Sequence, residues 1–186
     1  MKKAFTLVEM LIVILIVWVL FVLLSKVYIT SSKLYVYQKL TKNVDKDILF
    51  LNQTIQNLVD ETEIDYERYT WSKALDDSLW FTSHLYLKDN QFQYDLFASW
   101  EQVFLTKSWT NINITTPLTN NKLTKIKKFK FKIIPFQDPY KIFWPNAMQP
   151  FTTVFMEIQN ANYSTWSWET NIDYKIQESF NFKYFK

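Results

Sequence analysis

The pattern of apolar and polar positions begins with an almost unbroken apolar run. From Phe5 to Leu24 the only polar side chains are Thr6 and Glu9. Twenty helical residues rise about 30 Å, which matches the hydrocarbon core of a bilayer. A cleaved secretory signal would have a shorter apolar core followed by small residues of the A-x-A kind, and neither follows Leu24. Residues 5–24 are therefore predicted to form a membrane-spanning helix. Lys2 and Lys3 precede it and favour a cytoplasmic N-terminus.

A second pattern continues the helix beyond the membrane. Apolar side chains recur there every three or four residues and form one helical stripe, and the next proline is Pro117. We therefore expect one spine helix over residues 5–59, about 80 Å long, with its second half packed on a domain. A free-standing coiled coil is the alternative for this stripe. Its members are Leu34, Tyr37, Leu40, Val44, Ile48, Leu51, Ile55 and Leu58.

The helical pattern stops at an acidic stretch, Asp60–Glu67, and residues 60–78 are predicted to be a solvated linker. From residue 79 the pattern changes to alternation with period two, which is typical of strands. Lys88-Asp89-Asn90 separates two such runs like a hairpin turn. The expected fold class is α+β: a long N-terminal spine helix, membrane-spanning in its first half, packed on an antiparallel β-sheet domain over residues 79–186.

Composition and charge exclude several classes of function. The formal net charge of +3 comes from 21 basic and 18 acidic side chains spread along the chain, so no nucleic-acid partner is predicted. The basic segment Lys125–Lys132 is interpreted as an edge strand with lysines facing solvent. The chain has no cysteine and one histidine, His84, which is interpreted as a polar strand residue. No catalytic constellation or metal site is visible, so we expect no cofactor and no enzymatic activity.

The N-terminal residues carry a resemblance to a known family. The stretch Lys2-Lys3-Ala4-Phe5-Thr6-Leu7-Val8-Glu9-Met10-Leu11 resembles the cleavage and methylation motif of type IV prepilins and type II secretion pseudopilins. The resemblance implies a leader peptide at residues 1–4, cleavage by prepilin peptidase between Ala4 and Phe5, and N-methylation of Phe5. The family usually has glycine at the position of Ala4. It further implies a single-pass inner-membrane protein, with a cytoplasmic N-terminus, that later joins an extracytoplasmic filament of pilin or pseudopilin subunits.

Glu9 is the candidate assembly residue. A carboxylate within an apolar span costs a few kcal/mol unless it is paired, so its first interpretation is functional. In the family, the matching glutamate is thought to offset the free amine of a neighbouring subunit. The resemblance thus implies a pair between Glu9 of one copy and the Phe5 amine of the next. The alternative is a glutamate that reaches the membrane interface near the helix start.

The tryptophans raise a separate question. The chain has eight tryptophans and no glycine, although about 13 glycines would be expected for this length. Trp18 lies in Ile-Val-Trp-Val-Leu, where the family often has glycine, and the others lie in turn-like polar settings. Since some bacterial lineages read UGA as glycine, we hypothesise that most of the eight are glycine in the organism. They are Trp18, Trp71, Trp80, Trp100, Trp109, Trp144, Trp166 and Trp168.

Two other classes of function remain as alternatives to a filament subunit. A single-pass anchored binding protein or adhesin would not polymerise, would retain its leader and would tolerate the loss of Glu9. A membrane-tethered hydrolase would need a nucleophile and a base, for which the sequence gives no constellation. Within the filament class, the resemblance fits a type IV pilus, a type II secretion filament and a DNA-uptake filament equally.

Overall fold

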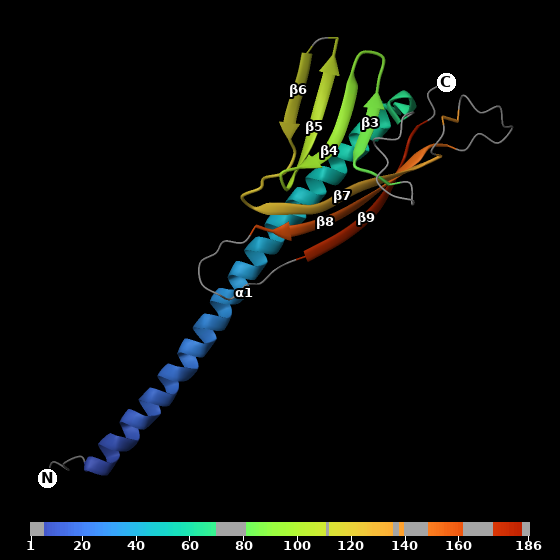
Figure 1. Ribbon diagram of the computed structural model, residues 1–186. Helices are drawn as coiled ribbons and strands as arrows, with labels where there is room; N and C mark the ends of the chain where they lie inside the picture. The colour runs from blue at the N-terminus through green and yellow to red at the C-terminus, as the bar shows by residue number, and fades with distance from the viewer. Residues whose placement is uncertain are drawn as a thin grey trace. The chain divides into compact units, whose positions relative to one another are not determined.

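The structure is a computed structural model, shown in Figure 1. It describes residues 6–69, 81–110, 112–135, 138–139, 149–161 and 173–183. The chain divides into two units, residues 1–39 and residues 40–186. The predicted α+β class is confirmed, since one long apolar helix precedes two antiparallel sheets and packs against them.

The first element is α1, a single helix of 55 residues from Leu7 to Glu61. In the first unit every described side chain except Ser25 is exposed. These exposed residues include the described part of the apolar run, up to Leu24, and α1 is long and apolar enough to cross a membrane. A surface of this kind is unfavourable in water, because each exposed apolar side chain forgoes about 1.5–3 kcal/mol of burial.

In the second unit, α1 contributes one buried face. Val44, Leu51, Ile55 and Val59 have no exposed surface, and they are spaced by seven, four and four residues. They join the sheet side chains in one core, with Ile48 and other partly buried residues packed around them. The second half of the predicted stripe therefore packs on the β-domain, as expected, and does not form a free-standing coiled coil.

The strands form two sheets, and every pair is antiparallel. The five-stranded sheet has the order β1-β3-β4-β5-β6 and the four-stranded sheet the order β2-β7-β8-β9. In Figure 1, β7, β8 and β9 cross the second half of α1. The first sheet contains β1 (Glu63–Ile64), β3 (His84–Lys88), β4 (Gln93–Ser99), β5 (Gln102–Trp109) and β6 (Ile112–Pro117); the second contains β2 (Phe81–Thr82), β7 (Thr124–Ile134), β8 (Phe151–Asn160) and β9 (Asp173–Asn181).

The predicted turn at Lys88-Asp89-Asn90 joins β3 to β4. The Asp89 backbone N–H donates to the Phe92 carbonyl at 2.9 Å. The Asp89 carboxylate accepts hydrogen bonds from the Gln91 and Phe92 N–H groups at 2.7 and 2.6 Å. An aspartate that binds the backbone two and three residues ahead is a typical turn former, so the local sequence determines this hairpin.

The acidic stretch after the helix is not a solvated linker in its described part: about half of its residues are buried, while the side chains of Glu61, Glu63 and Glu67 are exposed. Thr62, Ile64, Asp65 and Tyr66 are buried. β1 pairs with β3, and a short 3₁₀ helix η1 (Tyr66–Tyr69) follows. Tyr69 donates from its hydroxyl to the His84 carbonyl at 3.1 Å and accepts from the Tyr86 N–H at 2.6 Å. The high content of carboxylates led to the prediction of a solvated segment, although apolar and aromatic residues alternate with them. Residues 70–80 lie outside the described part of the chain.

The interpretation of Lys125–Lys132 as an edge strand holds for residues 125–130, which have a strand partner on one side only among the described residues, and is wrong for Phe131 and Lys132. This segment lies in β7, which pairs with β8 along its length and with the short strand β2 near its end. Lys127 and Lys128 are exposed, as expected for lysines that face solvent, and Lys125 and Lys130 are partly buried. The neighbouring strand β2 has only two residues and gives no periodic signal in the sequence.

The turn between β4 and β5 has an unusual backbone. Ser99 pairs with Gln102, so the connection consists of Trp100 and Glu101 alone. Their φ angles are 52° and 62°, both in the left-handed region. Two-residue hairpins with positive φ at both positions strongly favour Asn-Gly or Gly-Gly. Trp100 is 88% exposed, so burial of the ring does not offset the strain.

Candidate functional site

The candidate site is the start of α1. Ala4 and Phe5, the predicted cleavage and methylation residues, lie outside the described part of the chain, so their predicted roles stay predictions. Thr6 is the first described residue and directly precedes the helix, which begins at Leu7. Glu9 lies in the first helical turn, on the same short segment.

Thr6 and Glu9 form a reciprocal capping arrangement. The Thr6 N–H donates to Glu9 Oε2 at 2.8 Å, and the Thr6 hydroxyl donates to the same oxygen at 2.9 Å. The Glu9 N–H donates back to Thr6 Oγ1 at 3.3 Å. This is a capping box, in which the residue before the helix and the third helical residue bind each other's backbone N–H groups. Two N–H groups that would otherwise lack partners at the helix start are thereby satisfied.

The capping box gives Glu9 a local role that the sequence interpretation did not include. The signal was present as Thr-x-x-Glu directly before an apolar run, which is the sequence signature of this cap. The carboxylate is thus held toward the beginning of the chain by its own helix. A carboxylate in the first turn also interacts favourably with the positive end of the helix dipole. Both effects are independent of any neighbouring subunit.

The helix that follows this cap has an apolar surface up to Leu24, without polar side chains after Glu9. Between Met10 and Leu24 the described side chains are apolar and exposed. Within the described residues, no group of three or more His, Cys, Asp or Glu side chains is arranged to hold a metal ion. What this segment can do chemically is insert into a membrane or pack against similar helices.

The single histidine lies in β3, on the β-domain. Its Nδ1 lies 2.9 Å from Asp95 Oδ1. Its ring stacks between those of Tyr86 and Phe97, with centroid distances of 5.5 and 5.0 Å. The interpretation of His84 as a polar strand residue is confirmed, and its neighbours place it in a cross-strand aromatic row.

Three lysines of β7 have carboxylate neighbours. Lys125 lies 2.9 Å from Glu101, Lys127 lies 3.5 Å from Asp173, and Lys128 lies 3.2 Å from Glu157. Each pair joins β7 to another part of the β-domain. Such solvent-exposed pairs contribute about 0–1 kcal/mol each to stability.

Comparisons of the chain with protein-family models, with curated proteins and with solved structures found no match.

Proposed function

We propose that this chain is a pilin-like or pseudopilin-like structural subunit of a type IV pilus or type II secretion type filament. One observation carries the proposal: the motif at residues 2–11 opens directly into α1, a helix of 55 residues. From Leu7 to Leu24 this helix is exposed and, apart from Glu9, apolar, and its residues beyond 40 form part of the β-domain core. A filament subunit needs both parts in one chain, because its helix holds it in the filament and its β-domain forms the outer surface.

The proposed life cycle follows from the chemistry of the helix start. The chain inserts in the inner membrane with its N-terminus in the cytoplasm, and prepilin peptidase cleaves it between Ala4 and Phe5. Phe5 then carries the new amine and is N-methylated. During assembly the apolar surface of α1 leaves lipid and packs against the helices of neighbouring subunits. No step needs a cofactor or a catalytic residue of this chain.

Glu9 sets the register of subunits in this proposal. The capping box directs its carboxylate toward the chain start, where the amine of a processed subunit lies. In an apolar filament core, a carboxylate or amine without its partner would cost several kcal/mol. A neighbour placed so that Glu9 meets the Phe5 amine is therefore favoured over one displaced by a helical turn.

The second candidate is a single-pass anchored binding protein or adhesin that does not polymerise. The capping box supports this alternative, because it gives Glu9 a helix-starting role within one chain. The two functions differ in whether the charge of Glu9 is needed or only its ability to accept hydrogen bonds.

Two substitutions of Glu9 separate these functions. Glu9→Gln retains the capping box, since glutamine also serves at this position, and removes the charge. We expect Glu9→Gln and Glu9→Ala to insert and be cleaved normally but to be lost from sheared surface filaments. The measurement is the ratio of filament to membrane protein in cells that also contain the wild-type subunit. If Glu9→Gln enters filaments as well as wild type, the charge-pairing role is wrong.

A further inference from the structure

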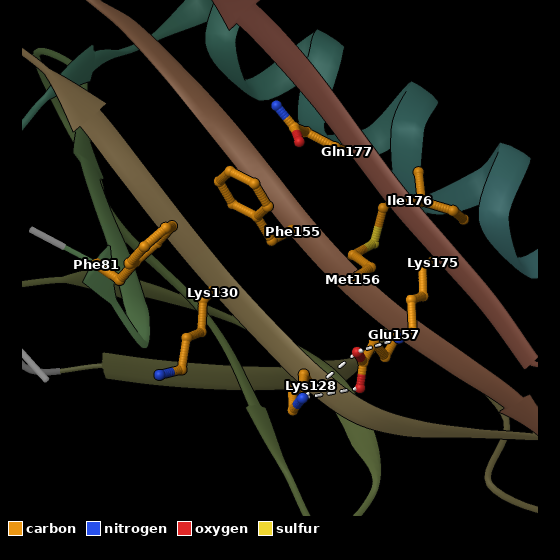
Figure 2. A pocket seen from close by; sticks show the side chains of 9 residues that line it. All are labelled: Phe81, Lys128, Lys130, Phe155, Met156, Glu157, Lys175, Ile176 and Gln177. Carbon is orange, nitrogen blue, oxygen red and sulfur yellow. Dashed lines mark hydrogen bonds and ion pairs between the residues drawn. The ribbon is translucent and has the colours of Figure 1, made fainter. Parts of the chain in front are cut away.

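The outer face of the four-stranded sheet carries a groove of about 370 Å³. Figure 2 shows the side chains that line it, which come from β2, β7, β8 and β9. Phe81 and Phe155 form part of the floor, and their rings meet edge to face at 5.0 Å. Lys128, Lys130 and Lys175 also line the groove.

The groove is cationic. Its three lysines face one carboxylate, that of Glu157, so its lining has a net charge of +2. Lys128 and Lys175 lie on either side of this carboxylate, at 3.2 and 3.6 Å. The hydrogen bond from Lys128 lowers the pKa of Glu157, with the charges of both lysines acting in the same direction. The groove therefore suits an anionic partner that can also lay carbon against two aromatic rings.

The end of α1 carries the opposite charge. Five carboxylates fall within the eight residues Asp60–Glu67, and all of them except the buried Asp65 reach the surface. The last turn of the helix contains no basic residue, although the negative end of the helix dipole favours cations there. Hydrogen bonds from Gln56 and from Lys183 lower the pKa of Asp60, and the Lys183 ammonium lies 3.3 Å from its carboxylate. Glu61, Glu63 and Glu67 are exposed.

The two surfaces lie at different levels along α1. The start of β7 is held beside the middle of the helix, since Thr124 donates to Asp47 at 2.5 Å. The residue that follows β7, Pro135, lies next to the segment that follows α1, since the Tyr66 hydroxyl donates to the Pro135 carbonyl at 3.0 Å. Lys128 and Lys130 lie at the middle of β7, one residue on either side of its centre, and so between these two levels. A second copy displaced along the helix direction could therefore bring its acidic end to this groove.

We propose that the groove binds the acidic helix end, Asp60–Glu67, of a second copy of the chain. The glutamate carboxylates would reach the lysines, and their methylene groups would lie on the phenylalanine rings. The contact joins two different surfaces, so each copy offers one free surface of each kind and the contact can repeat in an open chain. This inference rests on the proposed function, for which it names a contact between neighbouring β-domains.

The test is zero-length carbodiimide cross-linking of the processed chain in sheared filaments, with isotopically light and heavy copies mixed. Peptide mass spectrometry should find light-to-heavy links from Lys128, Lys130 or Lys175 to a carboxylate of residues 60–67. Lys175→Glu should abolish these links, because it replaces one of the three positive charges of the groove with a negative one. The Lys175 side chain is 81% exposed, so this charge reversal leaves the fold intact. Glu61→Lys in the same chain should restore links by exchanging the charges. Lys122→Glu, an exposed turn residue outside the groove, is the matched control.

Filaments that contain light-to-heavy links between α1 helices but none between the groove and residues 60–67 would overturn this inference and leave the proposed function standing. The inference would also be overturned if the groove lysines were linked to a carboxylate of another protein. The same holds if only an acidic polysaccharide or anionic vesicles protected these lysines from the cross-linking reaction. A chain that keeps its leader and forms no filament would contradict the proposed function itself. In that case, light-to-heavy links in membranes would still support the groove contact.

Discussion

The backbone at Trp100 allows a quantitative prediction. A residue other than glycine in the left-handed region costs about 1–2 kcal/mol, and Trp100 has φ of 52° and is 88% exposed. Trp100→Gly removes this cost. It also gives the unfolded chain more freedom, which opposes stability by about 0.4–1 kcal/mol. The net expectation is a gain of about 1 kcal/mol in the free energy of unfolding.

The assay is thermal unfolding of the full-length chain in detergent, followed by the β-sheet circular dichroism signal. For a chain of this size, about 1 kcal/mol corresponds to a rise in Tm of roughly 2–4 °C. Trp100→Ala is the matched control, because it removes the ring but keeps the β-carbon, and it should give no rise. A Tm for Trp100→Gly equal to or below that of Trp100→Ala would refute the strain argument.

The strained turn at Trp100 is one reason to expect a different residue at this position in the organism. Trp18, Trp100 and Trp109 are the tryptophans within the described residues, and all three are exposed, although tryptophan is highly buried on average. Peptide mass spectrometry of the native protein should find glycine at most of the eight positions, with in-frame UGA codons in the gene. UGG codons at these positions would end the recoding hypothesis. The turn at Trp100 would then be a strained feature of the protein.

Two further predictions concern the β-domain. Leu51→Ala should lower the free energy of unfolding by about 2–5 kcal/mol, because the side chain is fully buried. Leu49→Ala, at an exposed position of the same helix, should change it by less than about 0.5 kcal/mol. Equal effects of the two substitutions in denaturant titrations would contradict the assigned helix face. Burial alone would raise the pKa of Asp89, but hydrogen bonds from Gln91, Phe92 and Tyr94 outweigh it and lower the pKa. Since the folded-state pKa lies below the unfolded value of about 3.9, this stabilisation is present above that pH and is lost as the pH falls through the folded-state pKa. Asp89→Asn should remove it, so a wild-type minus mutant difference that stays constant from pH 7 to pH 2 would be the contrary result.

The sequence predicts the helix and the core face well because both depend on periodicity. Leu51 and Ile55 belong to a stripe that one helix must bury, and the turn at Asp89 depends on local side-chain chemistry. The packing of the acidic segment was not predictable in this way. Tyr66 and Tyr69 are fixed by partners 69 and 15 residues away in the sequence, and no local pattern contains that information.

At the candidate site, the sequence pointed to Glu9 but not to its hydrogen bonds. The resemblance directed attention to a partner in another subunit, while the Thr6–Glu9 spacing already specified a partner within the same turn. The groove on the four-stranded sheet was not predictable. Phe81 lies in a two-residue strand, and the register that brings it near Phe155 is a property of the assembled sheet.

The central claim is that this chain is processed as a filament subunit, and the mass of its N-terminal peptide tests it most directly. The protein is isolated from cells with an active prepilin peptidase, and its N-terminal peptide is fragmented by mass spectrometry. The account predicts a peptide that begins at Phe5 and carries one N-methyl group. Recovery of intact Met1 as the N-terminus would contradict it.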